Sequence, residues 1–134
     1  MIKVTEDDFN VGKIVNDAKH PDNGAIVTFL GIVRDDGIIG MEIEAYTDLA
    51  MQELDKIEQE ALERFNIRSL DVIHRTGTLS VGDNILLIVC GASHRKDAFA
   101  ACEYMIDELK ERAHVWKKEL HNDGASGKWV GEET

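Results

Sequence analysis

Three stretches of the chain carry apolar residues at the spacing of an amphipathic helix. The first covers residues 10–18, with Asn10 as its predicted N-cap, and ends before a loop around Pro21. The second covers residues 54–65 and has acidic side chains on its outer face. The third covers residues 98–113 and follows Ser93, a residue type whose hydroxyl caps helix N-termini. We therefore predict three helices, with Ser93 as the N-cap of the third.

The segments between these helices have the character of strands. Residues 24–33 are rich in β-branched side chains and almost wholly apolar, which predicts a strand buried on both faces. Further strands are predicted at residues 41–46, 69–75, 76–81 and 85–89. Because helices and strands do not alternate regularly, the order favours an α+β fold, with a mixed or antiparallel sheet and flanking helices. We place no domain boundary, so residues 1–134 form one predicted domain with a looser tail from about residue 122.

The charge balance limits the possible partners. Lys and Arg number 15 and Asp and Glu number 26, which gives a formal net charge of −11. Such a protein repels a phosphate backbone, so we expect no nucleic-acid partner. No apolar run approaches the roughly 18 to 20 residues of a membrane span, and the first residues lack the apolar core of a signal peptide. We expect a cytoplasmic protein without a membrane partner.

The two cysteines predict neither a disulfide nor a metal site. Cys90 lies within an apolar strand-like segment, and Cys102 lies on the apolar stripe of the third helix. The sequence has no CxxC or HExxH motif, so both residues are interpreted as small buried hydrophobes. No metal and no cofactor are predicted.

The segment between the last apolar strand and the third helix is a candidate anion site. The main-chain N–H groups at a helix N-terminus attract anions, and His94 and Arg95 add side-chain donors there. The alternative is that they are solvated residues of the first turn. Gly91 and Ser93 also resemble part of a GxSxG nucleophile elbow, but Arg95 replaces the final glycine. A hydrolase built on Ser93 is therefore the weaker hypothesis.

A second cationic cluster follows the third helix. Four of the fifteen Lys and Arg residues fall within residues 110–118. If the helix continues, Lys110 and Lys117 lie about two turns apart on one face and could address one ligand. The alternative is a solvated cationic turn that suits the helix dipole. A lysine beside other cations is a setting that favours catalysis, so Lys110 is the first candidate.

Several segments together resemble the catalytic (large) subunit of molybdopterin synthase, over about residues 9–130. The resemblance rests on Gly24–Gly31 with Val33-Arg34, Val72–Gly77 with Val81–Asp83, Ala92–Arg95 with Ala98-Phe99, Met105–Asp107 with Leu109-Lys110, and Trp116–Glu119. Each fragment alone is weak. Their order, their spacing and their coincidence with both cationic clusters make the set specific.

The resemblance implies a fold and an activity. The fold is α+β of the α/β-hammerhead type. The activity is sulfur transfer to cyclic pyranopterin monophosphate, which forms the dithiolene of molybdopterin in molybdenum-cofactor biosynthesis. The sulfur donor is a small ubiquitin-like subunit whose C-terminal Gly-Gly ends in a thiocarboxylate. Two large subunits form a central homodimer that two small ones flank, giving a heterotetramer.

The resemblance also implies the site residues. The matching substrate-binding positions are Ile32, Val33, Arg34, His94, Arg95, Lys110, Lys117, Lys118 and Glu119. Arg34, His94 and Arg95 would hold the phosphate and the pterin. Lys110 would be the principal catalytic group, and Lys117 would add positive charge near the thiocarboxylate.

Two positions depart from the family's pattern. His114 stands where the family usually has proline, which bears on the bend between the two lysines. Lys128 stands where relatives have arginine, and we keep it as a further candidate contact. A non-catalytic binding module for a ubiquitin-like sulfur carrier is the alternative function. The retention of both lysines, His94 and Arg95 favours the enzyme.

Overall fold

A computed structural model of the chain describes residues 1–122 and 129–131. Within these residues there are three helices and eight strands. In chain order they are β1 (Ile2–Thr5), α1 (Val11–Asp17), β2 (Ala25–Ile32), β3 (Gly40–Ala45), α2 (Thr47–Arg64), β4 (Ile67–Arg75), β5 (Gly77–Ser80), β6 (Asn84–Ala92), α3 (Arg95–Arg112), β7 (Val115–Leu120) and β8 (Val130–Gly131).

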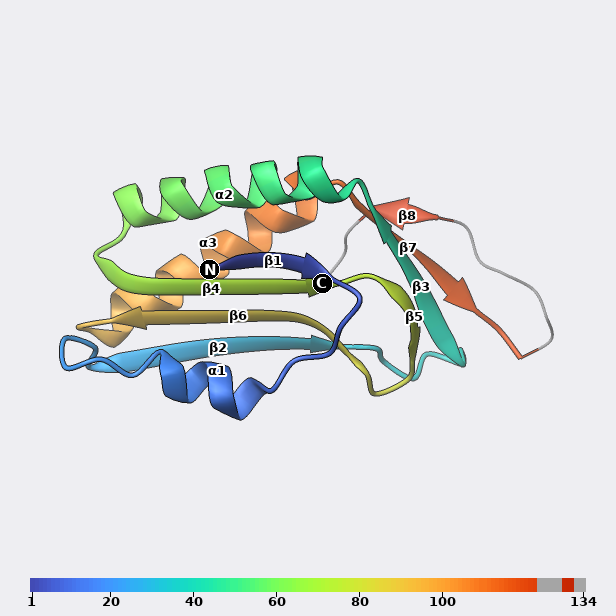
Figure 1. Cartoon of the computed structure of the whole chain (residues 1–134), viewed down its shortest axis with the longest axis horizontal. Coiled ribbons are helices and arrows are strands. Elements are labelled where there is room, and N and C mark those ends of the chain that lie inside the picture. The colour runs from blue at the N-terminus through green and yellow to red at the C-terminus, as the bar shows by residue number, and fades with distance from the viewer. Residues whose placement is uncertain (123–128, 132–134) are drawn as a thin grey trace.

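The strands form two four-stranded sheets. The first has the order β1-β4-β6-β2, in which only the β1–β4 pair is parallel. The second has the order β5-β3-β7-β8, is antiparallel throughout, and stands at one end of the first sheet (Figure 1). The predicted α+β class, with a mixed sheet and flanking helices, is confirmed.

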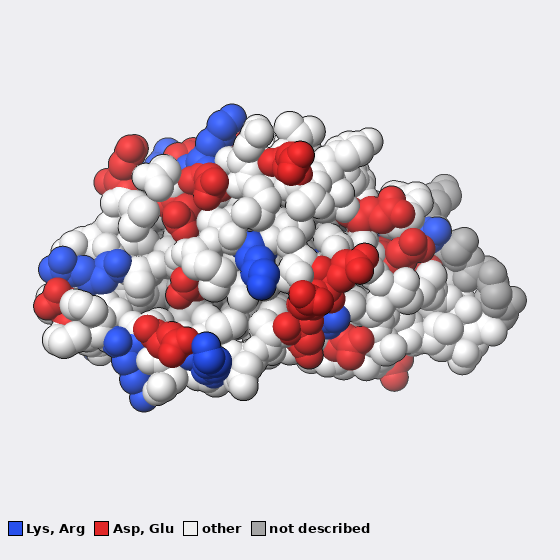
Figure 2. All heavy atoms as spheres, viewed as in Figure 1, with Lys and Arg blue, Asp and Glu red and all other residues white. Residues whose placement is uncertain are grey.

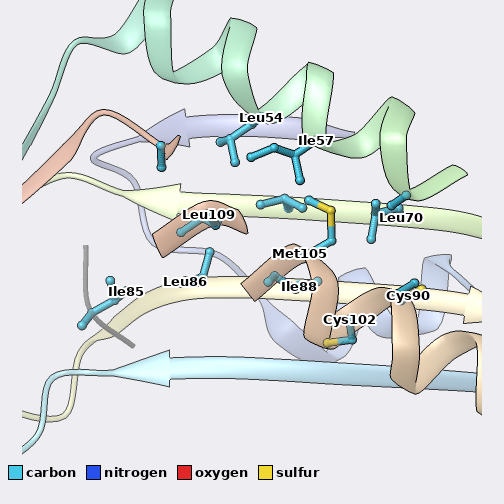
Figure 3. Packing of buried hydrophobic residues seen from close by; sticks show 14 of the residues in the cluster. Leu54, Ile57, Leu70, Ile85, Leu86, Ile88, Cys90, Cys102, Met105 and Leu109 are labelled. Atoms are coloured by element: carbon cyan, nitrogen blue, oxygen red, sulfur yellow. The ribbon is translucent and has the colours of Figure 1, made fainter. Parts of the chain in front are cut away.

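Helices cover both faces of the first sheet. The central strand β6 is buried on both sides because its side chains alternate. Leu86 and Ile88 face α2 and α3, where Leu54 and Met105 pack against the same core (Figure 3). Leu87 and Val89 point to the opposite face, where apolar side chains of α1 and the segment before it cover them. Asn10 caps α1 as predicted, because its side chain accepts a hydrogen bond from the Lys13 N–H.

The cysteines are small buried core residues, as predicted. Cys90 on β6 and Cys102 on α3 are free and are 0% and 4% exposed. Burial raises the pKa of Cys90 to about 12 and that of Cys102 to about 11, so both remain thiols at neutral pH. Over residues 1–122 and 129–131, no cluster of three metal-ligating side chains occurs and no helix is long and apolar enough to cross a membrane.

The prediction that residues 24–33 are buried on both faces is wrong. Strand β2 lies at the edge of the first sheet and is only partly covered. The side chains of Leu30 and Ile32 are 39% and 49% exposed. Apolar composition alone does not distinguish a central strand from an edge strand, because it does not show which neighbours cover the strand.

The start and the end of α3 also differ from the predictions. Ser93 is not the N-cap: its Oγ donates to the carbonyl of Asp22 at 3.0 Å, and His94 takes the cap position without a side-chain cap bond. The helix ends at Arg112, and His114 adopts a left-handed φ of 56° that turns the chain into β7. Lys117 therefore lies on a strand, not on the helix.

Arg112 ties the last turn of α3 to α2. Its Nε donates to Glu53 Oε1 at 2.7 Å, and its Nη1 lies 2.8 Å from Glu60 Oε2. Glu108 adds a third carboxylate, at 3.6 Å. The hydrogen bond from Arg112 is the main cause that lowers the pKa of Glu53 below its ordinary value.

Replacing Arg112 by methionine is expected to reduce the free energy of unfolding by about 2 kcal/mol at pH 7, because charge-assisted hydrogen bonds are lost and carboxylates stay unpaired. The pKa of Glu53 is depressed in the folded protein, so its contribution is present above the unfolded value and is lost as pH falls through the folded value. The difference between the two proteins, measured by urea unfolding, should therefore shrink below about pH 4.

The control for Arg112 is Lys56→Met, which removes a 69% exposed lysine that lies 3.8 Å from the same Glu53. It should change the stability by less than about 0.5 kcal/mol. Equal losses in the two variants, or a difference that does not depend on pH, would contradict the role given to Arg112.

Candidate functional site

A hollow of about 520 Å³ lies where the end of the first sheet meets the second. Four charged side chains line it, namely Arg34, Asp36, Lys117 and Glu119. The rest of its lining is mainly apolar and comes from several elements, including Phe29, Ile32, Ile38, Met41, Ile85 and Val130. The hollow thus combines two cations and two carboxylates with apolar walls that suit a flat ring.

Lys117 is the most enclosed of the charged residues in the hollow. It lies on β7, between Ile43 of β3 and Val130 of β8, and is only 5% exposed. Glu119 lies two residues further along β7 and faces the same hollow, as the two-residue repeat of a strand requires. An ammonium in such a position interacts more strongly with an anion than one in open water.

Lys118 is not in this hollow. Its ammonium lies 3.4 Å from Glu42 Oε2 and 4.6 Å from the centre of the Trp129 ring. Strand alternation turns its side chain to the face opposite Lys117 and Glu119. The three consecutive positions that the family resemblance implies as substrate-binding are therefore divided between two faces of β7.

Arg34 and its neighbours sit at the end of β2. Ile32 and Arg34 line the hollow, whereas the Val33 side chain is 1% exposed and belongs to the core. The N–H of Val33 donates to the carbonyl of Asp83 at 3.0 Å. Val33 thus fixes the positions of Ile32 and Arg34 on either side of it, and its own side chain does not line the hollow.

Lys110 lies in a second, neighbouring hollow of about 390 Å³. This hollow is formed at the end of α3 and the start of β7, and its lining includes Glu53, His114 and Trp116. Lys110 is exposed there. The helix does not continue to Lys117, so Lys110 and Lys117 do not share a helical face; the turn at His114 separates them.

His94 and Arg95 lie at the other end of the first sheet. In the β2–β6 pair, Ala25 is opposite Ala92, just before these two residues, and Ile32 is opposite Asn84. The eight residues of β2 span roughly 25 Å. Within one chain, His94 and Arg95 therefore cannot contact the same small ligand as Arg34 and Lys117. Lys128 falls outside the described residues.

Sequence reasoning missed part of the hollow. Asp36, Ile38, Met41 and Ile85 all line it. They come from a loop and two strands, and no motif links them. The sequence offered one signal for these residues: Asp36 lies two positions after Arg34, a candidate substrate-binding residue.

The chemistry of the hollow favours a ligand that carries an anionic group and an apolar or planar part. Arg34 can grip a phosphate with two parallel hydrogen bonds, and Lys117 supplies a point charge. The hydroxyl of Ser93 donates to a main-chain carbonyl and lies at the start of α3, which argues against a hydrolase. The fold and the hollow define the class: this is an α+β protein whose two sheets meet at a hollow lined by two cations, two carboxylates and apolar side chains.

Comparison with known proteins identifies the family. The family model described as "MoaE protein" matches residues 4–112. A molybdopterin synthase catalytic subunit of Pyrococcus abyssi is 41% identical, and the match covers 88% of this chain and 82% of the relative. The corresponding subunit of Thermoplasma volcanium is 36% identical, with 96% of each chain covered.

Solved structures agree with this result. Molybdopterin synthase from Staphylococcus aureus superposes with a TM-score of 0.87 at 32% identity and covers 96% of each chain. A complex of subunits 1 and 2 of the Helicobacter pylori molybdopterin-converting factor shares the fold, with a TM-score of 0.79 at 24% identity, and covers 98% of this chain and 90% of the other. The chain belongs to the MoaE family of molybdopterin synthase catalytic subunits. The predictions of this family and of an enzyme in molybdopterin biosynthesis are confirmed.

Proposed function

We propose that this chain catalyses the transfer of two sulfur atoms, one from each of two thiocarboxylated ubiquitin-like subunits, to cyclic pyranopterin monophosphate, which yields the dithiolene of molybdopterin. Oxygen from water replaces each transferred sulfur, so each small subunit is left with an ordinary C-terminal carboxylate. The observation that carries the proposal is the hollow in which an almost fully buried Lys117 and the exposed Arg34 stand beside apolar walls. A cyclic phosphate fused to a flat pterin has the charge and the shape that such a hollow accepts. The enzyme acts as one domain in the cytoplasm, without a metal or cofactor.

We assign a separate role to each side chain at the site. Arg34 binds the cyclic phosphate, with Ile32 and Glu119 beside it in the hollow. Lys117 stabilises the negative charge that develops as sulfur attacks the substrate. Lys110, from the adjacent hollow, transfers a proton during the same steps. Lys118 supports the strand through its contacts with Glu42 and Trp129, and Lys128 remains a proposed contact.

A second copy of the chain completes this arrangement. His94 and Arg95 lie roughly 25 Å from the hollow of their own chain, by the length of β2. Strand β2 is an edge strand with exposed apolar side chains. Antiparallel pairing of two β2 strands about a two-fold axis would place Ala25 of one copy near Ile32 of the other. The second copy's His94 and Arg95 would then approach the phosphate bound at Arg34.

The small subunit brings the sulfur. The Helicobacter pylori structure pairs two subunits of a molybdopterin-converting factor, which supports a heteromeric enzyme in this family. The thiocarboxylate at the C-terminus of such a subunit is the nucleophile, and Lys117 is the residue proposed to stabilise the charge that develops during its attack. The C-terminal tail therefore has to reach Lys117. We propose a homodimer of this chain that two small subunits flank.

Replacing Leu30 by glutamate is expected to weaken the homodimer at least about tenfold, because it buries two carboxylates at the β2 edge. Light scattering at tens of micromolar protein should show a shift from dimer to monomer mass. Leu62→Glu on α2 is the matched control, since Leu62 is equally exposed, at 39%. A monomeric wild type, or dissociation by both variants, would contradict this interface.

Reconstitution tests the activity directly. The purified chain is mixed with cyclic pyranopterin monophosphate and a thiocarboxylated small subunit, and molybdopterin is detected by mass spectrometry. A small subunit that ends in an ordinary carboxylate is the control, and it should give no product. Binding of the thiocarboxylated subunit without product would favour the alternative, a non-catalytic binding module.

A further inference from the structure

The loop that carries Arg34 is held at both ends by the core. Val33 before it and Ile38 after it are 1% and 6% exposed. The carbonyl of Val33 accepts a hydrogen bond from the Gly82 N–H at 2.9 Å, and the N–H of Ile39 donates to the carbonyl of Leu120 at 2.9 Å. Residues 34–37 therefore form a short loop on a fixed base, beside the hollow.

The turn of this loop separates its two acidic side chains. Gly37 adopts a left-handed φ of 77°, and its N–H donates to Asp35 Oδ1 at 3.3 Å. Asp36 instead faces Arg34, with 3.2 Å between Asp36 Oδ2 and Arg34 Nε. Arg34 and Asp36 both line the hollow, whereas Asp35 does not contribute to its lining.

The charges within the hollow balance one another. Arg34 and Lys117 face Asp36 and Glu119, so two cations are matched by two carboxylates. A guanidinium can hold a phosphate with two hydrogen bonds through the edge that includes Nε, and Asp36 occupies the Nε of that edge. The Arg34–Asp36 pair is exposed, with side chains 82% and 50% accessible, so a ligand can displace it at little cost.

We propose that Asp36 is an internal competitor for the anion site: it holds Arg34 in the unliganded protein and releases it when a phosphate-bearing ligand binds. The inference rests on the proposed function, in which Arg34 binds the substrate phosphate. The exchange has a consequence for specificity. A ligand that also packs against the apolar walls outweighs the lost pair, whereas a free inorganic anion gains only contacts with the charged groups of the hollow.

A phosphate titration tests this competition without any activity measurement. Inorganic phosphate is added at constant ionic strength, and the Nε–H resonance of Arg34 and the main-chain amides of the loop are followed by NMR. Asp36→Asn should tighten phosphate binding about two- to fivefold, the range expected for an exposed ion pair. Asp35→Asn removes the same charge one residue away and should change the affinity less than 1.5-fold by comparison.

A double-variant cycle separates competition from a general charge effect. In an Arg34→Ala background, Asp36→Asn should no longer tighten phosphate binding, because the competed group is gone. Equal tightening by Asp35→Asn and Asp36→Asn, or tightening that persists without Arg34, would overturn the proposal. Phosphate binding that never involves Arg34 would overturn it as well. Molybdopterin formation by the reconstituted wild type reports on the proposed function independently of all these results.

Discussion

Replacing Lys117 by alanine is expected to slow molybdopterin formation by at least about 100-fold, the size of effect seen when one group that stabilises transition-state charge is removed. Lys117 is 5% exposed and lines the hollow beside Arg34. Because Lys117 is buried, water screens the charge of its ammonium only weakly. In the alanine variant, water would therefore be a poor substitute for that charge. Single-turnover assays with saturating thiocarboxylated subunit would measure the loss in the chemical step.

The same strand offers a matched control. Lys118→Ala removes an identical charge from the opposite face of β7, where its contacts are Glu42 and Trp129. Its rate should stay within about threefold of the wild type, as befits a partly exposed ion pair. Lys117→Met keeps the aliphatic stem that packs in the hollow, which separates loss of charge from loss of folding. Equal losses at positions 117 and 118 would contradict the role assigned to Lys117.

Replacing Lys110 by alanine is expected to lower the rate by about 100-fold or more, in the range of a lost proton-transfer group. Lys110 lies on the last turn of α3, in the hollow adjacent to that of Lys117. Lys110→Arg distinguishes two mechanisms. Arginine keeps the positive charge but does not release a proton at physiological pH, so it should fail to restore activity if Lys110 transfers a proton.

The controls for Lys110 concern folding and surface charge. Lys56→Ala removes an exposed lysine from α2 and should leave the rate unchanged within about twofold. Thermal unfolding of each variant confirms that an inactive protein is folded. Full activity in a folded Lys110→Ala protein would remove Lys110 from the mechanism and leave Lys117 as the catalytic lysine.

The charged side chains on one face of the molecule are mixed in sign (Figure 2). On the face shown in Figure 2, Lys and Arg are scattered among Asp and Glu and do not form a continuous basic surface. The formal net charge is −11. A net negative charge of this size does not attract anions over long distances. The proposed binding of an anionic substrate therefore depends on short-range contacts with Arg34 and Lys117 in the hollow.

Local sequence patterns determined most of the secondary structure. The helical repeat located α2, the apolar run of residues 85–89 located the centre of β6, and Asn10 capped α1 as predicted. These features follow from interactions between residues close in sequence, which periodicity reports directly. The ordered motifs also determined the family, because they extend over nearly the whole chain.

Tertiary structure alone decided how the candidate residues are grouped. The left-handed turn at His114 placed Lys117 on a strand, and strand alternation then sent Lys118 to the other face. The antiparallel register of β2 and β6 separated Arg95 from Arg34 by the length of a strand.

The edge position of β2 and the pairing of Asp36 with Arg34 were likewise decided by the fold. Each depends on which segments, distant in sequence, lie side by side, and the packing of the helices on the first sheet and of the second sheet at its end selects that arrangement (Figure 1). A sequence pattern reports which face of an element is apolar. It does not report which other element that face will meet, and this is why the sequence determined the elements and the family, while the tertiary structure determined the site.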